Sequence, residues 1–340
     1  MSLFTRSPAP ILTPRADVPW ASGAVFNPGA WYEEGVVHLI FRAIPQGYKA
    51  IQLEIAEQDG PDTGFDHTYV SYLGYAGSTD GVHFEWREAP FLVPDAPFDR
   101  YGAEDARISK VDDTFLITYT ALSHPAFGTM DGVRIGLATT KDFVHIEKHG
   151  VVGPPVRDKD AVIFPRRIGG RIAMLHRVTP DIQLVYFDDF SQLFNPPAAF
   201  WQAHLDTLEQ HVILRPRAGW ESKKIGAGPT PIETEEGWLL IYHGVDENLV
   251  YRAGLALLDL DDPSRVIARC PTPVLEPETD YELYGDVNNV VFPEGAVVID
   301  GVLHVYYGAA DFVIGHASAS LSDVLAHLRS PVIGHLNPTL

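Results

Sequence analysis

The sequence predicts an all-β fold, a five-bladed β-propeller with a short C-terminal helix, from three recurring patterns in its 340 residues. A short apolar strand that ends in a similar three-residue signature occurs five times. A turn signal precedes each copy, and a second apolar strand follows it. Five units of about 68 residues, each with several short strands, are typical of propeller blades. A large β-sandwich with accidental internal similarity is the alternative.

The first strand of each unit is an apolar run that begins after a turn pair such as Glu34-Gly35 or Asp300-Gly301. Its five copies are HLIFRA ending at Ala43, FLITYTA at Ala121, IAMLHR at Arg177, LLIYHG at Gly244 and HVYYG at Gly308. The regular return of the same strand and the same turn chemistry indicates a structural repeat.

The second strand of each unit usually has a Gly-X-Ala core. Four copies keep this core: Gly74-Tyr75-Ala76, Gly136-Leu137-Ala138, Gly254-Leu255-Ala256 and Gly315-His316-Ala317. The third copy, Ile182 to Phe187, stays apolar but lacks the glycine. Recurrence of two different strands in the same order favours repeated blades over coincidence.

We expect a single propeller domain over residues 1–340, because no linker-like or low-complexity segment divides the chain. Radial closure would protect the edges of the sheets and bury the repeats against each other. After Ser320, apolar residues recur at helical spacing as far as Leu328, which predicts a short packing helix. Ser320 and Asp323 could form its capping box.

The charge balance is acidic, with 45 Asp and Glu against 25 Lys and Arg and a net charge of −20. It argues against nucleic acid or an anionic membrane as the main partner, but it allows a small anion in a local cluster of cations. The single cysteine, Cys270, excludes an intramolecular disulfide and a thiolate metal site. Without a signal-peptide run or an apolar stretch of membrane-spanning length, a cytoplasmic protein is expected. Homo-oligomerisation stays open.

The middle position of each signature is polar within an otherwise apolar strand. These positions are Arg42, Thr120, His176, His243 and Tyr307. We expect the signature strands to line the central channel, so that their alternation turns these side chains toward the axis. A polar face on five buried strands is costly unless something polar binds there. A ring of side chains that only hydrogen-bond one another around a wet channel is the alternative.

Other classes of enzyme chemistry have little support in the sequence. The sequence has no His-Glu-x-x-His, Walker, dinucleotide-binding or Gly-x-Ser-x-Gly motif. The 14 histidines lack metal-ligand spacing, so neither a metal nor a cofactor is expected.

Segments spread in order along nearly the whole chain carry a more specific signal. They are Phe26-Asn27-Pro28, Phe41-Arg42-Ala43, Gly102 to Arg107, Asp158-Lys159-Asp160 with Phe164-Pro165, Met174 to Arg177, Lys224-Ile225-Gly226, Gly237-Trp238 through Tyr242-His243-Gly244, Val290 to Pro293 and Tyr306 to Asp311. Together they resemble glycoside hydrolase family 130. The resemblance implies a five-bladed propeller from a family of mostly inverting phosphorylases of β-mannosides, with some β-mannosidases.

The resemblance also implies roles for individual residues. Asp105 matches the single catalytic acid, which protonates the glycosidic oxygen through a sugar hydroxyl. Asp311 matches a carboxylate that holds the mannose, with Asn27 and Asp160 also expected at the substrate. The phosphate-binding residues would be Arg42, Lys159, Arg177, Lys224, His243 and Tyr251.

This set of residues suits a phosphorylase on physical grounds. An inverting hydrolase needs an acid and a base that activates water. A phosphorylase replaces the base with phosphate, which is already a nucleophile, and so needs one acid and cations that hold and aim the anion.

Two departures from the family pattern stand out. The acid lies in Glu-Asp-Ala-Arg, without the family's usual proline. Lys159-Asp160 stands where many of the phosphorylases have Arg-Asn. Lysine keeps the charge but loses the bidentate fork of arginine, and Asp160 adds a negative charge near the phosphate.

We therefore expect inverting phosphorolysis of β-1,2- or β-1,4-linked mannooligosaccharides that gives α-mannose 1-phosphate, with inorganic phosphate as the co-substrate. One alternative is an inverting β-mannosidase on the same scaffold, in which Asp160 or Glu104 assists a water molecule. Another is a sugar-binding propeller without catalysis, which needs no proton donor. The linkage and the acceptor sugar stay open.

Overall fold

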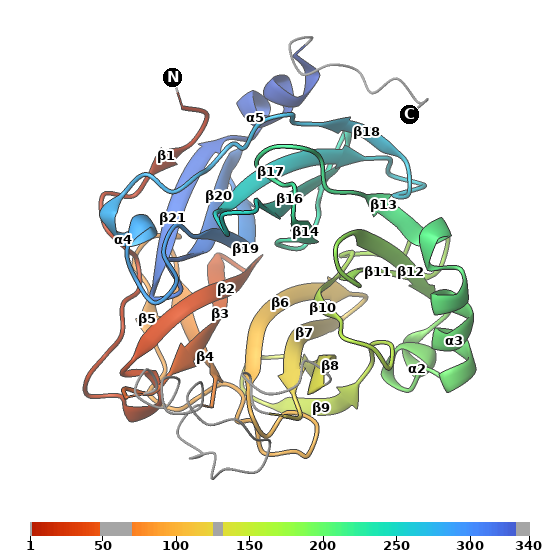
Figure 1. Ribbon diagram of the computed structural model, residues 1–340. Helices are drawn as coiled ribbons and strands as arrows, with labels where there is room; N and C mark the ends of the chain where they lie inside the picture. The colour runs from red at the N-terminus through yellow and green to blue at the C-terminus, as the bar shows by residue number, and fades with distance from the viewer. Residues whose placement is uncertain (1, 48–69, 125–131, 331–340) are drawn as a thin grey trace.

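The computed structural model describes residues 2–47, 70–124 and 132–330. In it, five antiparallel sheets surround a common axis, which confirms the predicted five-bladed β-propeller (Figure 1). Each sheet follows the previous one along the chain, and the fifth is completed by the N-terminal strand β1 (Thr5–Arg6). Because β1 pairs with β21 (Val313–Ser320), the two ends of the described chain close the ring together.

The strands of the first four sheets follow chain order from one edge to the other. The first sheet holds β2 (Ala24–Glu33), β3 (Val36–Ile44), β4 (Tyr72–Ser78) and β5 (Glu85–Trp86). The second holds β6 (Ala103–Val111), β7 (Thr114–Leu122), β8 (Val133–Thr140) and β9 (Ile146–Val151). The third holds β10 (Lys159–Ile163), β11 (Ile172–Arg177), β12 (Ile182–Phe187) and β13 (Val212–Leu214). The fourth holds β14 (Lys224–Ala227), β16 (Gly237–Val245), β17 (Tyr251–Leu258) and β18 (Val266–Arg269), with β15 (Ile232–Thr234) also paired to β16.

The fifth sheet has the order β19 (Val291–Ile299), β20 (Val302–Ala309), β21 and β1. The first strand of each sheet, namely β2, β6, β10, β14 or β19, lies nearest the axis (Figure 1). Our expectation that the signature strands are innermost is therefore wrong. Those strands, β3, β7, β11, β16 and β20, come second in each sheet.

The Gly-X-Ala strands are the third strands, and their glycines have a packing reason. Gly74 lies opposite Phe41, and a Cβ atom at this glycine would overlap the phenyl ring. Gly136 and Gly254 face tyrosine rings of the second strand in the same way. In the third sheet Leu175 replaces the aromatic ring and lies opposite Leu184, so no glycine is needed.

Apolar side chains from neighbouring sheets form the core. One cluster joins Leu175 of the third sheet to Leu240 of the fourth, and another joins Ile40 of the first to Ile117 of the second. Each signature strand buries side chains on both of its faces, and this accounts for its nearly continuous apolar run.

The predicted C-terminal helix is α5 (Leu321–Arg329), which buries Val324, Leu325 and Leu328. Ser320 is its N-cap residue, but its side chain contacts Ser322 and makes no capping hydrogen bond. The shorter helices, which lie in connections between strands, were not predicted from the sequence. They are η1 (Pro19–Ala21), α2 (Phe190–Phe194), α3 (Ala198–Asp206), η3 (Leu208–His211) and α4 (Asp280–Leu283). Among the described residues, none of the helices has the length and apolar character needed to cross a bilayer.

Candidate active site

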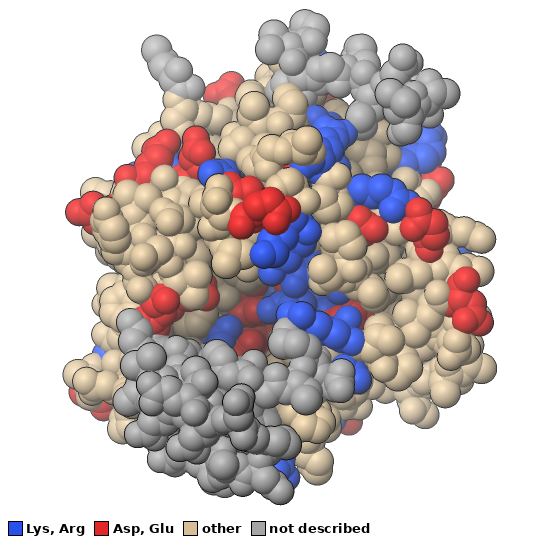
Figure 2. Space-filling model, in the orientation of Figure 1, with Lys and Arg blue, Asp and Glu red and all other residues tan. Residues whose placement is uncertain are grey.

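Residues from all five blades line a cavity of about 140 Å³ where the blades meet. The lining consists of Asn27, Arg42, Asp105, Lys159, Arg177, Lys224, His243, Tyr251, Val287, Val290, Phe292 and Asp311. Lys and Arg side chains gather around a hollow near the middle of this face, with acidic side chains inside it (Figure 2). The structure thus brings together every predicted site residue except Asp160, which lies behind the cavity wall.

Bulges in the inner strands aim polar side chains into this region. The pairing register shifts between Phe26 and Pro28 in β2, and similar shifts occur in β6, β10 and β19. Asn27, Asp105 and Asp160 lie in these bulges with positive φ angles of 50°, 54° and 57°. Left-handed backbone is strained for residues with a side chain, and such strain is concentrated at functional sites. Each bulge interrupts the alternation of side chains between the two faces of its strand and so changes the direction in which the side chain points.

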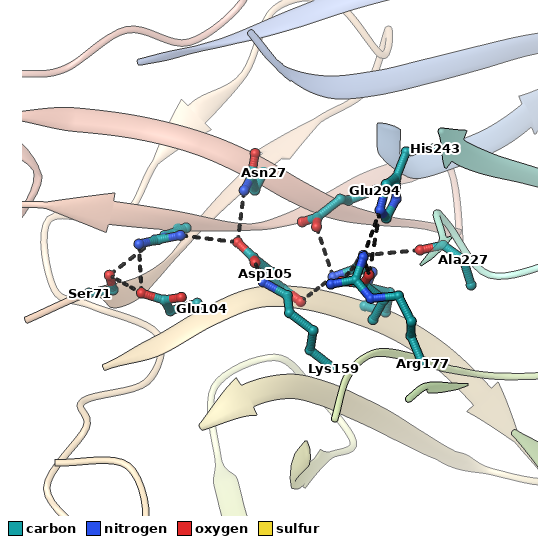
Figure 3. A network of polar contacts seen from close by, with 12 residues as sticks. Asn27, Ser71, Glu104, Asp105, Lys159, Arg177, Ala227, His243 and Glu294 are labelled. Carbon is teal, nitrogen blue, oxygen red and sulfur yellow. Dashed lines mark hydrogen bonds and ion pairs between the residues drawn. The ribbon is translucent and has the colours of Figure 1, made fainter. Parts of the chain in front are cut away.

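Asp105 lies at the centre of the polar network, between Asn27 and Lys159 (Figure 3). Its Oδ1 accepts a hydrogen bond of 2.8 Å from Asn27 Nδ2, and its Oδ2 lies 2.9 Å from Lys159 Nζ. Burial opposes ionisation of Asp105, but Lys159, Arg42 and Arg107 outweigh it and hold the pKa well below its ordinary value. In the empty site Asp105 is therefore a carboxylate.

Arg42 connects the first two blades beside Asp105. Its Nη2 lies 2.6 Å from Glu104 Oε1, and its Nε donates to Ser71 Oγ at 3.0 Å. Ser71 in turn donates to the same Glu104 oxygen. Glu104 is thus occupied by Arg42 and Ser71 and does not line the cavity in the described part of the chain.

Arg177 and His243 form the wall opposite; Asp160 holds Arg177 from behind, and Arg177 in turn contacts His243. Arg177 Nη1 lies 2.5 Å from Asp160 Oδ2 and donates to His243 Nε2 at 3.0 Å. Burial holds the pKa of His243 well below its ordinary value, so the ring is neutral and its proton lies on Nδ1. Within the described chain, Arg177 Nε and His243 Nδ1 are buried without a hydrogen-bond partner. Unpaired buried donors at a cavity wall suit an anion.

Lys224 completes the cationic side of the cavity. Its Nζ lies 5.3 Å from the centre of the Tyr251 ring, and it has no ion pair with any carboxylate of the described residues. Burial, together with the positive charges of Arg177 and Lys159, lowers the pKa of Lys224 to about 7. An anion beside Lys224 would relieve this repulsion and restore its proton.

Asp311 is the second carboxylate on the cavity wall. It directly follows the turn at Ala310 after β20, and both residues have positive φ angles. Burial raises the pKa of Asp311 to about 6; Arg42 opposes this rise and Asp105 adds to it. A half-buried carboxylate on the cavity wall is suited to accept hydrogen bonds from sugar hydroxyls.

The buried pair of Arg107 and Glu294 beneath the cavity was not predicted from the sequence. Arg107 Nη1 lies 2.8 Å from Glu294 Oε1 and donates to the backbone carbonyl of Asp105 at 2.6 Å. The same guanidinium donates to the carbonyls of Ala227 and Gly228, so it links three inner strands (Figure 3). A charged residue directly after Phe292-Pro293 in an apolar strand was the available signal for Glu294.

Three of the five predicted axis residues do not line the cavity in the described chain. His176 hydrogen-bonds Asp158 and His204, and Tyr307 donates to Glu282. Tyr307 packs on Gly315 as the aromatic rings of other blades pack on their glycines. Thr120 is buried. In the described chain these three side chains neither line the cavity nor hydrogen-bond one another, whereas Arg42 and His243 reach the cavity.

Known proteins resemble this chain over almost its full length. The family model of glycoside hydrolase family 130, described as β-1,4-mannooligosaccharide phosphorylase, matches residues 16–330. A 1,2-β-oligomannan phosphorylase of Thermoanaerobacter sp. (strain X514) is 40% identical over 94% of this chain and 97% of its own length. A β-1,4-mannooligosaccharide phosphorylase of Ruminococcus albus is 34% identical over 74% of this chain and 75% of its own. The solved β-1,2-mannobiose phosphorylase of Listeria innocua, in complex with β-1,2-mannobiose, superposes with a TM-score of 0.77 at 32% identity, covering 96% of this chain and 99% of that one.

Proposed function

Because the chain belongs to glycoside hydrolase family 130, we propose that it is a phosphorylase of β-mannosides. The observation that carries this proposal is the cationic side of the cavity. Arg42, Lys159, Arg177 and Lys224 line one small cavity in a protein of net charge −20. Lys224 has no carboxylate partner among the described residues, and a bound anion would stabilise its charged form.

In the proposed reaction, an oxygen of inorganic phosphate attacks the anomeric carbon of the mannosyl unit. The bond from this carbon to the glycosidic oxygen breaks with inversion, and that oxygen takes a proton that Asp105 supplies through a sugar hydroxyl. The products are α-mannose 1-phosphate and the shortened acceptor. Asn27 would fix the Asp105 carboxyl, and Asp311 would hold the mannose hydroxyls. No metal or cofactor takes part in this scheme.

The charges suggest why the acid needs phosphate. Lys159 and Arg42 keep Asp105 ionised in the empty site, and an ionised carboxyl cannot donate a proton. A phosphate dianion beside these cations would offset their field and raise the pKa of Asp105. Phosphate would thus serve as nucleophile and also allow the acid to take up its proton.

A hydrolytic mechanism has less support from the geometry. The candidates for a base that activates water were Asp160 and Glu104. Asp160 is ion-paired with Arg177, and Glu104 is ion-paired with Arg42. Neither carboxylate lines the cavity in the described chain.

The direct test compares product formation with and without phosphate. The purified protein is incubated with β-1,2-mannobiose and, separately, with β-1,4-mannobiose. The β-1,2 linkage is the first choice, since the relative at 40% identity is named for it. We expect α-mannose 1-phosphate, identified by NMR, only when phosphate is present. Equal release of free mannose in both conditions would eliminate phosphorolysis.

Gly308→Ala is expected to disable the site without touching any charged group. The new Cβ atom would overlap Asn27 Oδ1 and displace the side chain that holds Asp105. Because small misplacements of catalytic groups are costly, we expect kcat/KM to fall roughly 100-fold. Gly77→Ala is the control for the loss of a glycine, because its φ angle is not left-handed and an added Cβ atom would meet no atom closer than 3.4 Å. Gly308→Ala with wild-type kcat/KM would contradict the role of Asn27.

A further inference from the structure

Asp160 was expected at the substrate, but its position assigns it a different task. Its side chain is buried, and its Oδ2 lies 2.5 Å from Arg177 Nη1 and 3.5 Å from His243 Nε2. Its Oδ1 lies 3.6 Å from Arg107 Nη2. Asp160 therefore contacts the residues that face the cavity and does not itself line the cavity in the described chain.

The surroundings of Asp160 are built to hold it in this place. The residue occupies a bulge of β10 with a φ angle of 57°. Gly226 of the next blade leaves just enough room, because a Cβ atom there would overlap Asp160 Oδ2 and the His243 ring. Although burial opposes ionisation, the charges of Arg177, Lys159 and Arg107 hold the pKa of Asp160 below its ordinary value. The side chain is thus a fixed negative charge.

That charge has two opposite effects on an anion in the cavity. The contact with Asp160 fixes the Arg177 guanidinium, which spares the entropic cost of ordering it when phosphate binds. The same contact satisfies part of the positive charge of Arg177 before any ligand arrives, and the carboxylate repels a phosphate dianion directly.

We propose that Asp160 is a positioning residue that also limits phosphate affinity: it holds Arg177 and competes with the bound anion for the charge of that guanidinium. This inference rests on the proposed function, since it assumes that phosphate occupies the cavity. Its consequence is an anion site that is well ordered but binds weakly. Both phosphate and a sugar phosphate product would leave it readily.

Asp160→Asn separates the two effects. Asparagine retains an oxygen that can accept from Arg177, and it tolerates left-handed backbone better than most residues. The substitution removes the charge and keeps the shape. We expect the Kd for inorganic phosphate, measured by calorimetry, to fall about tenfold, and the KM for phosphate to fall with it. Inhibition by α-mannose 1-phosphate should strengthen by a similar factor, while kcat changes less than threefold.

Asp160→Gly is a second test of the same proposal, to be used if the asparagine variant folds poorly. Glycine accepts the positive φ angle at this position without strain. It removes both the charge and the hold on Arg177, so we expect tighter phosphate binding than in the wild type together with a lower kcat. The matched control is Glu221→Gln, which neutralises another buried carboxylate, 2.8 Å from Arg269. This control should lower the melting temperature and leave the Kd for phosphate unchanged.

The outcomes distinguish this inference from the proposed function. Wild-type protein that binds no phosphate at millimolar concentrations would contradict the proposed function. If the wild type binds phosphate and Asp160→Asn binds it equally well or more weakly, Asp160 only supports the fold or the position of Arg177. The limiting effect on affinity would then be overturned.

Discussion

Asp105→Asn is expected to lower kcat for phosphorolysis by roughly 10²- to 10⁴-fold, the range that loss of a positioned general acid produces. The amide cannot donate a proton as an acid does, but its oxygen can still accept the hydrogen bond from Asn27. The KM for phosphate should change less than kcat, because the residues on the opposite wall are untouched. The measurement is steady-state kinetics with β-1,2-mannobiose at saturating phosphate.

The control must account for the loss of a buried ion pair, which alone is destabilising. Asp99 offers the match: it is buried, its Oδ2 lies 2.8 Å from Lys148 Nζ, and it lies outside the cavity lining of the described chain. Asp99→Asn should lower the melting temperature but keep wild-type kcat. If Asp105→Asn retains more than a tenth of wild-type kcat, Asp105 is not the acid.

Lys224→Ala is expected to raise the KM for phosphate by roughly 10- to 100-fold, since a charge-assisted contact to the anion is lost. Mannobiose binding, measured in the absence of phosphate, should change little. The adjacent Lys223 is exposed and does not line the cavity in the described chain, so Lys223→Ala is the control. Equal KM values for the two variants would show that Lys224 does not contact phosphate.

The pH dependence of the same two variants provides an independent readout. In the empty wild-type site Lys224 has a pKa of about 7, so it loses its charge as the pH rises through that value. The KM for phosphate should therefore rise with pH in the wild type and in Lys223→Ala. In Lys224→Ala, the part of this rise in KM that comes from loss of the Lys224 charge should be absent. Phosphate itself also titrates, but it does so equally with each variant, so its effect cancels when the variants are compared.

The blade count could be predicted because it rests on the most regular strands. The second and third strands of each sheet are buried on both faces, and their aromatic and glycine pairs recur at matching positions. The inner strands could not be recognised in the same way. Their bulges at residues such as Asn27 and Asp105 interrupt the alternation of side chains, which is the signal that sequence patterns use. The predicted number of blades was therefore right, but the strand assigned to the axis was wrong.

The site residues were predicted largely through the family motifs, and the cavity gathers nearly all of them. The sequence could not reveal which charged side chains face the cavity and which stand behind it. Lys159 and Asp160 are neighbours in the chain, yet the lysine lines the cavity and the aspartate lies behind Arg177. The bulge in β10 turns these two neighbouring side chains in different directions. A similar bulge in β19 contains Glu294, so the alternation of side chains along that strand did not reveal its position.

The pairing of β1 with β21 has a consequence for how the chain folds. Thr5 is made long before its partner, Ser318, because nearly the whole propeller lies between them in the chain. Four sheets can form while synthesis continues, whereas the ring stays open until β21 has been made. Contacts between distant parts of a chain form slowly because a long loop must close. Until that step is complete, the free edge of β21 is a surface on which another chain could add a strand, so ring closure also protects the new protein from aggregation.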